Sequence, residues 1–598
     1  MDETQKARHG YLTYSKLTTE HIRLLELKPA TKSFDPIRCS LRTVPLGQAS
    51  NYEAISYVWG DKSPAKIVEV DGADIQITSN LFDVLLNIRR QDLSRTVWVD
   101  ALCINQEDLC ERCDQVSIMG RIYRQASGVL IYLGNEWDGL GIACEYLELA
   151  AQREDAHFAP SLQPHLEVRG QDISTPYLRD NLLRLFSSPW FSRVWTVQEF
   201  VLARKTTFFR GATTVDGKRL EQGIVNIRQH AQNRCCGPHS ILACGETFLN
   251  VIAQMEALND MRTIPKATSF LETLHHCRQR RCTNTRDKIY GMLGMEFKGQ
   301  ASCLQPKYDI SVEQLFVDVA REQLEQTRTL DVLSCVVPGK RRTSLSIPSY
   351  VPDWTLMTKN ILTHHLSIDH LMTLPHYNAS GGFPAEFHIG PGDRALTKGI
   401  AIDRIEALGP ACFFSDLASC GQAKDYVNEA RRSAGLPGRP PDSFEAASAR
   451  ELEFWRTLCG NLAVHVGEKS RDWRAADPAV DYESYLQWSD IVNRVPSADP
   501  KLDNRPAFED ALVATLSARR FMRTSKGHFG MVAPGSQPGD VVMILAGGRV
   551  PYVLCEELGY KTGNGPVTYS FIGDAYVDGF MYGECVGDDP EWMWLNLI

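Results

Sequence analysis

The sequence has 598 residues, of which 43% are hydrophobic and 23% are charged, and its formal net charge is −9. Such a composition is typical of a folded chain of about two to four domains and excludes wholesale disorder. The mild negative charge offers no basic surface for sequence-independent binding to nucleic acid, so no nucleic-acid partner is expected.

The amino-terminal residues and the cysteines indicate the compartment. The first thirty residues contain no apolar run of the length that a secretory signal needs, and no stretch of eighteen apolar residues occurs anywhere. The seventeen cysteines are scattered through apolar segments, which favours reduced thiols. A cytoplasmic protein without a membrane span is therefore expected.

After an amino-terminal extension over 1–45, short apolar segments alternate with helical ones between residues 46 and 215. A cap at Ser79 or Asn80 is expected for the first helix. The alternation predicts an α/β domain whose mostly parallel sheet is covered on both faces. Strands are expected at 52–60, 96–100, 128–134 and 206–210, and helices at 80–90, 109–126, 140–153, 177–187 and 194–204.

The rest of the chain changes character several times. A mainly helical region is expected over 216–335, and a mixed region of strands and loops over 336–432. Proline and glycine in 433–444 indicate a linker, which together with a helical insert occupies 433–520. Frequent turn signals over 521–598 predict a small β domain.

Motifs of several enzyme classes are missing. No phosphate-binding G-x-x-x-x-G-K-[ST] loop, no dinucleotide-binding G-x-G-x-x-G and no G-x-S-x-G nucleophile elbow occurs. These absences remove most of the support for a P-loop nucleotidase, a Rossmann oxidoreductase or an ordinary α/β-hydrolase.

Cysteine and histidine clusters do not have the spacing of a metal site. Cys110 and Cys113 lie one helical turn apart with Cys103 nearby, but a zinc site normally needs two such half-motifs. No metal is therefore expected. The two other clusters considered are His364, His365 and His370 as a metal site and Cys235, Cys236 and His239 as a reactive thiol, and both are disfavoured.

Ligands of parallel α/β sheets bind at the carboxyl ends of the strands. The candidate ligand-binding residues there are Ser56, Trp59, Gly60, Asp100 and Asn105. Each also has a structural interpretation. Ser56 and its neighbour Tyr57 could serve packing alone, and Asp100 and the Asn105-Gln106 pair could cap the following helix.

Four ordered blocks resemble the fungal heterokaryon-incompatibility (HET) domain: "YEAISYVWG", "VWVDALCINQED", "ERCDQVSIMGRIYRQASGVLIYLG" and "SSPWFSRVWTVQEFVLAR". Looser resemblance continues at 285–295, 348–354 and 573–584. The resemblance implies a role in fungal non-self recognition, in which incompatible partners trigger growth arrest or cell death. It also implies a flavodoxin-like parallel sheet, because the HET domain is similar to the TIR fold.

The same resemblance singles out Glu199. NAD-cleaving TIR domains carry a W-C-x-x-E pattern, and Trp195 and Glu199 keep its tryptophan and glutamate, with Thr196 in place of the cysteine. Glu199 is therefore the candidate catalytic residue and NAD a candidate substrate; no cofactor is certain. The amino end of the helix that starts near Arg193 would favour a phosphate, and Trp59 or Trp195 could stack on a base. Arg193 and Gln198 are further ligand candidates.

A structural alternative for Glu199 stays open. The carboxylate could brace the helix through an ion pair with Arg193 or Arg204, while Trp195 fills the core. Arg286 and Asp287 are expected to pair with each other or with a neighbouring segment and not to contact a substrate.

Three functions follow from these observations. The first is an effector or regulator of incompatibility-type cell death that hydrolyses NAD or another nucleotide. The second is a non-catalytic module that self-associates or binds a protein partner. The third is a HET-like enzyme of small-molecule biosynthesis.

Overall fold

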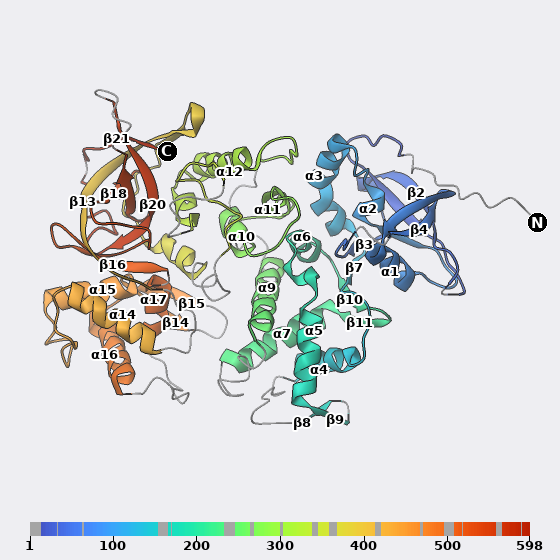
Figure 1. The fold of residues 1–598 in the computed structure, drawn as a ribbon, viewed down its shortest axis with the longest axis horizontal. Coiled ribbons are helices and arrows are strands. Elements are labelled where there is room, and N and C mark those ends of the chain that lie inside the picture. The colour runs from blue at the N-terminus through green and yellow to red at the C-terminus, as the bar shows by residue number, and fades with distance from the viewer. Residues whose placement is uncertain are drawn as a thin grey trace, which may run out of the picture. The chain divides into compact units, whose positions relative to one another are not determined.

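The computed structural model in Figure 1 describes residues 14–598 except 33, 62–64, 154–164, 169, 233–244, 264–267, 299–302, 338–344, 358–367, 413–419, 467–470, 495–506, 517, 558–564 and 588. The chain divides into two compact units. The first comprises residues up to 273 together with 280–309, and the second comprises 274–279 and 310–598. Within the described residues, no helix is both long and apolar enough to cross a membrane.

A nine-stranded mixed sheet forms the centre of the first unit, in the order β11-β10-β7-β3-β6-β1-β2-β4-β5. Its middle strands, β10, β7, β3 and β6, are parallel to one another. The strands are β1 (His21–Leu27), β2 (Arg38–Pro45), β3 (Glu53–Ser56), β4 (Ala65–Val70), β5 (Ala73–Thr78), β6 (Arg95–Trp98), β7 (Gly128–Tyr132), β10 (Thr206–Arg210) and β11 (Thr213–Asp216).

The sheet differs from a mostly parallel one on both flanks. β1 pairs antiparallel with β6 and with β2, and β11 pairs antiparallel with β10. Ile22, Leu24 and Leu25 of β1 have no exposed surface. The strands of the expected amino-terminal extension are thus integral to the sheet, and the hydrophobic run "IRLLEL" is their signal in the sequence.

The central strands are short and buried. β3 is enclosed on both faces because Ala54, Ile55 and Ser56 are each at most 1% exposed. Its register aligns Ser56 with Ile131 of β7. The expected strand at 52–60 therefore ends at Ser56, and residues 57–60 form a loop at its carboxyl end, where a ligand of a parallel sheet would lie.

Helices connect the parallel strands and cover the sheet. The 17-residue helix α3 buries the apolar stripe expected for it, including Val116, Ile122 and Tyr123. The connecting helices are α1 (Ser79–Ile88), α2 (Asp100–Cys103), α3 (Leu109–Gln125), α4 (Leu140–Gln152), α5 (Thr175–Phe186) and α6 (Thr196–Val201), with η2 (Pro189–Ser192) before α6 and the hairpin β8 (His165–Val168) and β9 (Gln171–Ser174) before α5.

The cap of α1 is Thr78, not Ser79 or Asn80 as expected. The Thr78 hydroxyl accepts a hydrogen bond from the Leu81 backbone N–H, because helical geometry begins one residue earlier than the sequence pattern indicated. We expect Thr78→Ala to lower the free energy of unfolding by about 1 kcal/mol. Urea denaturation followed by circular dichroism would measure the loss; Thr78→Ser, which keeps the hydroxyl, is the control, and equal losses in the two variants would contradict this role.

Past residue 216 the described part of the first unit is helical. α7 (Gly217–Gln232) packs on α4, and α9 (Gly245–Thr263) packs on α7, α5 and α6. α10 (Phe270–His276) lies at the division between the units. Residues 280–309, with the short helix α11 (Asp287–Tyr290), return to the first unit.

The second unit is built on an eight-stranded sheet that includes the long strand β13 (Ala395–Cys412). This sheet unites strands of the region expected to mix strands and loops, 336–432, with strands of the β region expected over 521–598. A buried ion pair joins Arg519 and Asp574, and Asp574 also bonds His370. The other strands are β12 (Phe387–Ile389), β16 (Arg519–Thr524), β17 (Phe529–Val532), β18 (Val541–Leu545), β19 (Tyr552–Glu556), β20 (Val567–Val577) and β21 (Met593–Leu597).

The helical insert of the second unit also contains an unexpected hairpin of β14 (Leu462–Val466) and β15 (Arg471–Ala475). Residues 434–448 separate two helices without regular structure, and the linker expected at 433–444 stays a prediction. The helices are α12 (Val312–Thr327), α14 (Cys420–Ser433), α15 (Ala449–Cys459), α16 (Pro478–Arg494) and α17 (Ala507–Leu516), and short 3-10 turns lie at η1 (Leu46–Gln48), η3 (Asp331–Cys335), η4 (Leu374–His376) and η5 (Pro391–Asp393).

Candidate functional site

Ser56 and Glu199 meet at the carboxyl end of β3. The Ser56 hydroxyl donates a hydrogen bond to Oε2 of Glu199, and it accepts one from the Trp190 indole N–H at 2.7 Å. Trp190 is fully buried against Phe200 and Phe208. This anchored indole fixes the direction in which Ser56 donates, so the hydroxyl points at the carboxylate.

Glu199 is only 6% exposed. Its burial raises the pKa of the carboxyl group from 4.5 to about 7, while the hydrogen bond from Ser56 and the positive charge of Arg193 act in the opposite direction. The negative charge of Asp100 raises the pKa further, and the Tyr123 hydroxyl lowers it. Near neutral pH the group can therefore hold or release a proton, as a general acid or base must.

Two tyrosines complete the surroundings of this carboxylate. Tyr57 and Tyr123 are buried, and burial raises the pKa of each hydroxyl, with Asp100 and Glu199 adding to the effect and Arg193 opposing it. The Tyr123 hydroxyl donates to the Ile55 carbonyl at 3.1 Å. The Tyr57 hydroxyl is buried and has no hydrogen-bond partner within the part of the chain that the structure describes.

Asp100 follows β6 and lies on the same edge of the sheet. Its Oδ2 accepts a hydrogen bond from the Trp59 indole N–H at 2.8 Å. Burial raises its pKa, and Trp59 and Arg193 oppose the shift. Asp100 is the first residue of α2 and its Oδ1 accepts from the Ala101 backbone N–H, but the N-cap of α2 is Val99 and no side chain caps the helix, so the capping role expected for Asp100 is wrong.

Arg193 precedes α6 and is not its first residue, because the helix starts at Thr196. Its guanidinium donates to the Tyr57 carbonyl at 3.0 Å. An arginine between Tyr57, Asp100 and Glu199 supplies positive charge where two carboxylates approach each other. The expectation of a phosphate site at the helix end loses support, since α6 has only six residues.

The structural alternative for Glu199, an ion pair with Arg193 or Arg204 while Trp195 fills the core, does not match the contacts. The carboxylate accepts from Ser56, while Arg193 donates to a backbone carbonyl. Trp190, and not Trp195, fills the core: Trp195 is partly exposed and its indole N–H donates to Asp287 at 3.1 Å. Asp287 thus contacts a neighbouring segment, as expected, and that segment is the helix that carries Glu199.

Gln198 lies one residue before Glu199 and is 1% exposed. Neither its amide nitrogen nor its amide oxygen has a hydrogen-bond partner among the described residues. It packs against Gly294, where an added Cβ would come within 2.5 Å of its amide oxygen. Contact with the ligand stays a prediction for this residue.

Gly60 has a structural role in the loop after β3. Its φ of +70° is unfavourable for other residues, and a Cβ there would lie 2.7 Å from the side-chain nitrogen of Asn80. Asn80 donates in turn to the Val58 carbonyl at 3.0 Å. Glycine at this position lets α1 hold the loop that carries Trp59.

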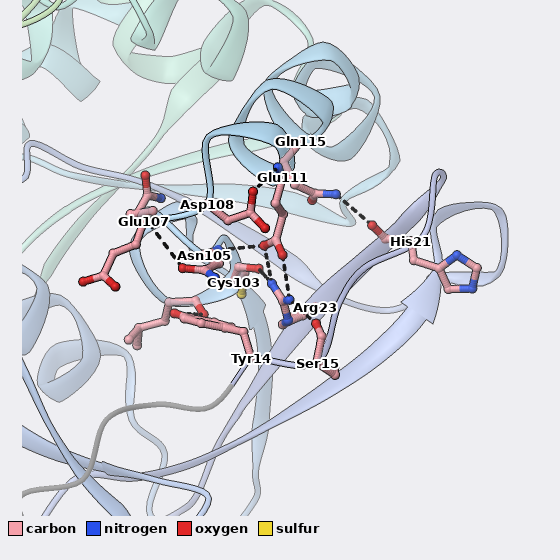
Figure 2. Close-up of polar contacts among 12 residues, drawn as sticks. Tyr14, Ser15, His21, Arg23, Cys103, Asn105, Glu107, Asp108, Glu111 and Gln115 are labelled. Atoms are coloured by element: carbon pink, nitrogen blue, oxygen red, sulfur yellow. Dashed lines mark hydrogen bonds and ion pairs between the residues drawn. The ribbon is translucent and has the colours of Figure 1, made fainter. Parts of the chain in front are cut away.

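Asn105 belongs to a separate polar network, which Figure 2 shows. Its side-chain oxygen accepts from the Glu107 backbone N–H, and its own N–H donates to Glu111 at 2.7 Å. Glu111 forms a buried ion pair with Arg23 of β1, and Arg23 also donates to the Cys103 carbonyl at 3.1 Å. The network ties β1 to the loop between α2 and α3, so Asn105 supports the site from outside it.

The other residues singled out in the sequence lie elsewhere. Cys110 and Cys113 are free thiols on α3, and Cys103 is a buried free thiol. His370 contacts Asp574 in the second unit. The remaining members of the two clusters, His364, His365, Cys235, Cys236 and His239, fall outside the described residues.

Sequence reasoning missed Tyr123, Asp287 and the role of Trp190. Tyr123 was expected only as a core residue of its helix, and Trp190 stands in the same block as Glu199 without a visible polar partner. Asp287 follows Trp195 by 92 positions, so no local spacing connects the two. Only the folded chain reveals these contacts.

The raised pKa of Glu199 predicts a pH dependence of stability. Between pH 4.5 and about pH 7 the folded state binds more protons than the unfolded state, so stability falls as the pH rises through this window. Relative to Glu199→Gln, the wild type should lose about 3 kcal/mol of unfolding free energy from pH 4.5 to about pH 8. Urea melts of both proteins across this range measure the difference; a constant difference would contradict the assignment.

Comparison with known proteins agrees with the resemblance seen in the sequence. Residues 52–199 match the family model of the heterokaryon incompatibility protein (HET), and residues 491–591 match that of the Het-6 β-barrel domain. The chain is 24% identical, over 652 aligned positions, to heterokaryon incompatibility protein 6, OR allele, of Neurospora crassa, with 94% of each chain covered. No solved structure matches the chain.

Proposed function

From the HET domain of this chain and its similarity to a fungal heterokaryon incompatibility protein, we infer that the protein acts in fungal non-self recognition. We propose further that the HET domain is an effector of growth arrest or cell death, that it cleaves NAD or a related nucleotide, and that Glu199 is its catalytic carboxylate. The contact between Glu199 and Ser56 at the carboxyl end of β3 carries this proposal.

The arrangement of the strands supports a TIR-like, flavodoxin-like domain. In chain order, the parallel strands are β3, β6, β7 and β10, and their order in the sheet is β6-β3-β7-β10. If the parallel strands are numbered 1 to 4 along the chain, their order in the sheet is 2-1-3-4, which is the order of flavodoxin-like sheets. In such sheets the ligand binds at the carboxyl end of the first strand, next to the point where the strand order reverses. Ser56 is the last residue of this first strand, β3, and its hydroxyl donates a hydrogen bond to Glu199.

The chemistry of the site suits cleavage of an N-glycosidic bond. Breaking the bond between nicotinamide and ribose develops positive charge on the sugar, which an ionised carboxylate stabilises. Glu199 is buried, so its charge acts in a medium of low polarity, and Ser56 orients one of its oxygens. Trp59 and Trp195 are partly exposed and each has its indole N–H held by an aspartate, which leaves their faces to stack on a planar base.

The biological role and the chemistry need separate experiments. Induced expression of the full chain in a fungal host should arrest growth, and unchanged growth at high expression would contradict the effector role.

Purified full-length protein incubated with NAD should release nicotinamide, measured by chromatography. No release, even at protein concentrations that allow self-association, would contradict the enzymatic proposal and favour a non-catalytic module that binds a partner or a second copy.

A further inference from the structure

Residues 280–309 lie outside the segment that matches the HET family model, yet they hold the loop before α6. The Val194 N–H donates to the Arg281 carbonyl at 2.9 Å, and the Arg281 N–H donates to the Ser192 carbonyl at 2.5 Å. The Arg280 guanidinium donates to the carbonyls of Phe191 and Arg193. This segment therefore determines where the chain between Trp190 and Glu199 lies.

Asp287 is the residue of this segment that reaches the site. It is 8% exposed, and each of its carboxylate oxygens accepts one hydrogen bond: Oδ2 from the Trp195 indole N–H at 3.1 Å and Oδ1 from the Tyr308 hydroxyl at 2.9 Å. The Arg112 guanidinium lies over the Tyr308 ring, 4.1 Å from its centroid. Two elements distant in sequence, α3 and residues 287–308, thus fix the orientation of one indole.

Trp195 has a geometry that a core residue would not need. Its ring is partly exposed although it directly precedes α6, whose residues Thr196 to Phe200 are all buried. The arrangement repeats at Trp59, whose indole N–H is held by Asp100 at 2.8 Å. Both tryptophans are therefore restrained at the nitrogen edge of the ring, and both side chains are partly exposed.

We propose that Asp287 is a positioning residue of the nucleotide site: it holds the Trp195 ring in the orientation in which the ring stacks on the base of the substrate. This inference rests on the proposed function. It assigns part of the site to residues 280–309, so the functional domain extends past the matched segment. Asp287 itself does not contact the substrate.

Three variants of the full chain separate positioning from stability. Asp287→Leu removes both acceptors. Asp287→Asn keeps an amide oxygen for the Trp195 indole, while its amide group donates to the Tyr308 hydroxyl oxygen. Asp331→Asn is the matched control, because Asp331 pairs with Arg549 within the second unit.

Kinetics with NAD give the first readout. We expect Asp287→Leu to raise KM at least tenfold with kcat changed less than threefold, because the ring stacks equally in the ground and transition states. Asp287→Asn should restore KM to within about threefold of the wild type. An unchanged KM in Asp287→Leu, or an equal rise in Asp287→Leu and Asp287→Asn, would overturn the inference.

The second readout does not depend on activity. The protein is labelled with 5-fluorotryptophan, and the ¹⁹F resonance of Trp195 is identified by its loss in Trp195→Phe. Asp287→Leu should shift or broaden this resonance, whereas Asp287→Asn and the control should leave it narrow. If the wild type neither binds nor cleaves NAD, the proposed function fails. The ¹⁹F spectrum then still tests whether Asp287 holds the Trp195 ring in place. An unaltered Trp195 resonance in Asp287→Leu would show that it does not.

Discussion

Glu199→Gln should reduce nicotinamide release from NAD by at least about 100-fold, with a smaller change in KM. Glutamine has the size of glutamate and its amide oxygen still accepts the hydrogen bond from Ser56, so the fold is kept while the charge is lost. Removing one electrostatic stabiliser of a transition state typically costs a factor of about 10² to 10³ in kcat. Initial rates of nicotinamide release at saturating NAD measure this effect.

Glu221→Gln is the matched control for this experiment. Glu221 lies on α7 of the same unit and pairs with Arg262. It should keep the wild-type rate. A Glu199→Gln protein that is folded and retains more than about a tenth of the wild-type rate would exclude Glu199 as the catalytic carboxylate.

Glu111→Ala should lower the free energy of unfolding by about 3–5 kcal/mol. Arg23 is 2% exposed and bonds both carboxylate oxygens of Glu111, so the variant leaves a buried positive charge without its counter-ion. The Asn105 N–H loses its acceptor as well. Thermal and urea denaturation of the full chain, followed at the transition of the first unit, would measure the loss.

The double variant Arg23→Met, Glu111→Leu tests the cause of this loss. It removes both charges and keeps apolar volume, so it should be more stable than Glu111→Ala. A loss of less than about 1 kcal/mol in Glu111→Ala, the value of an exposed pair, would show that the ion pair is not buried in solution. Either outcome tests the stability of the network around Arg23 and Glu111 and does not test the proposed reaction at Glu199.

The periodicity of the sequence predicted the centre of the fold well. β7 and β10 lie where the apolar runs at 128–134 and 206–210 placed them, and α3 and α4 follow the helical stripes closely. Such runs are readable because strands buried on both faces contain little besides apolar residues. Since the ends of parallel strands share one edge, the placement of Ser56 and Asp100 on that edge could be anticipated from the strands, whereas Glu199 of α6 was singled out only by the family resemblance.

Features that depend on distant contacts could not be predicted. β1 joins the sheet through pairing with β6, about seventy positions later in the chain, and a hydrophobic run alone does not name its partner. Asp287 and Tyr308 reach Trp195 only after residues 280–309 return to the first unit. The raised pKa of Glu199 likewise comes from burial, which a sequence reveals only as a tendency.

The location of bound NAD tests the account most directly. A crystal structure of the Glu199→Gln protein with NAD should place the nicotinamide ribose within hydrogen-bond distance of the residue 199 side chain, at the carboxyl ends of β3 and β6. The base should lie against the face of Trp59 or Trp195. NAD bound away from this edge of the sheet, or no binding at millimolar NAD, would contradict the account.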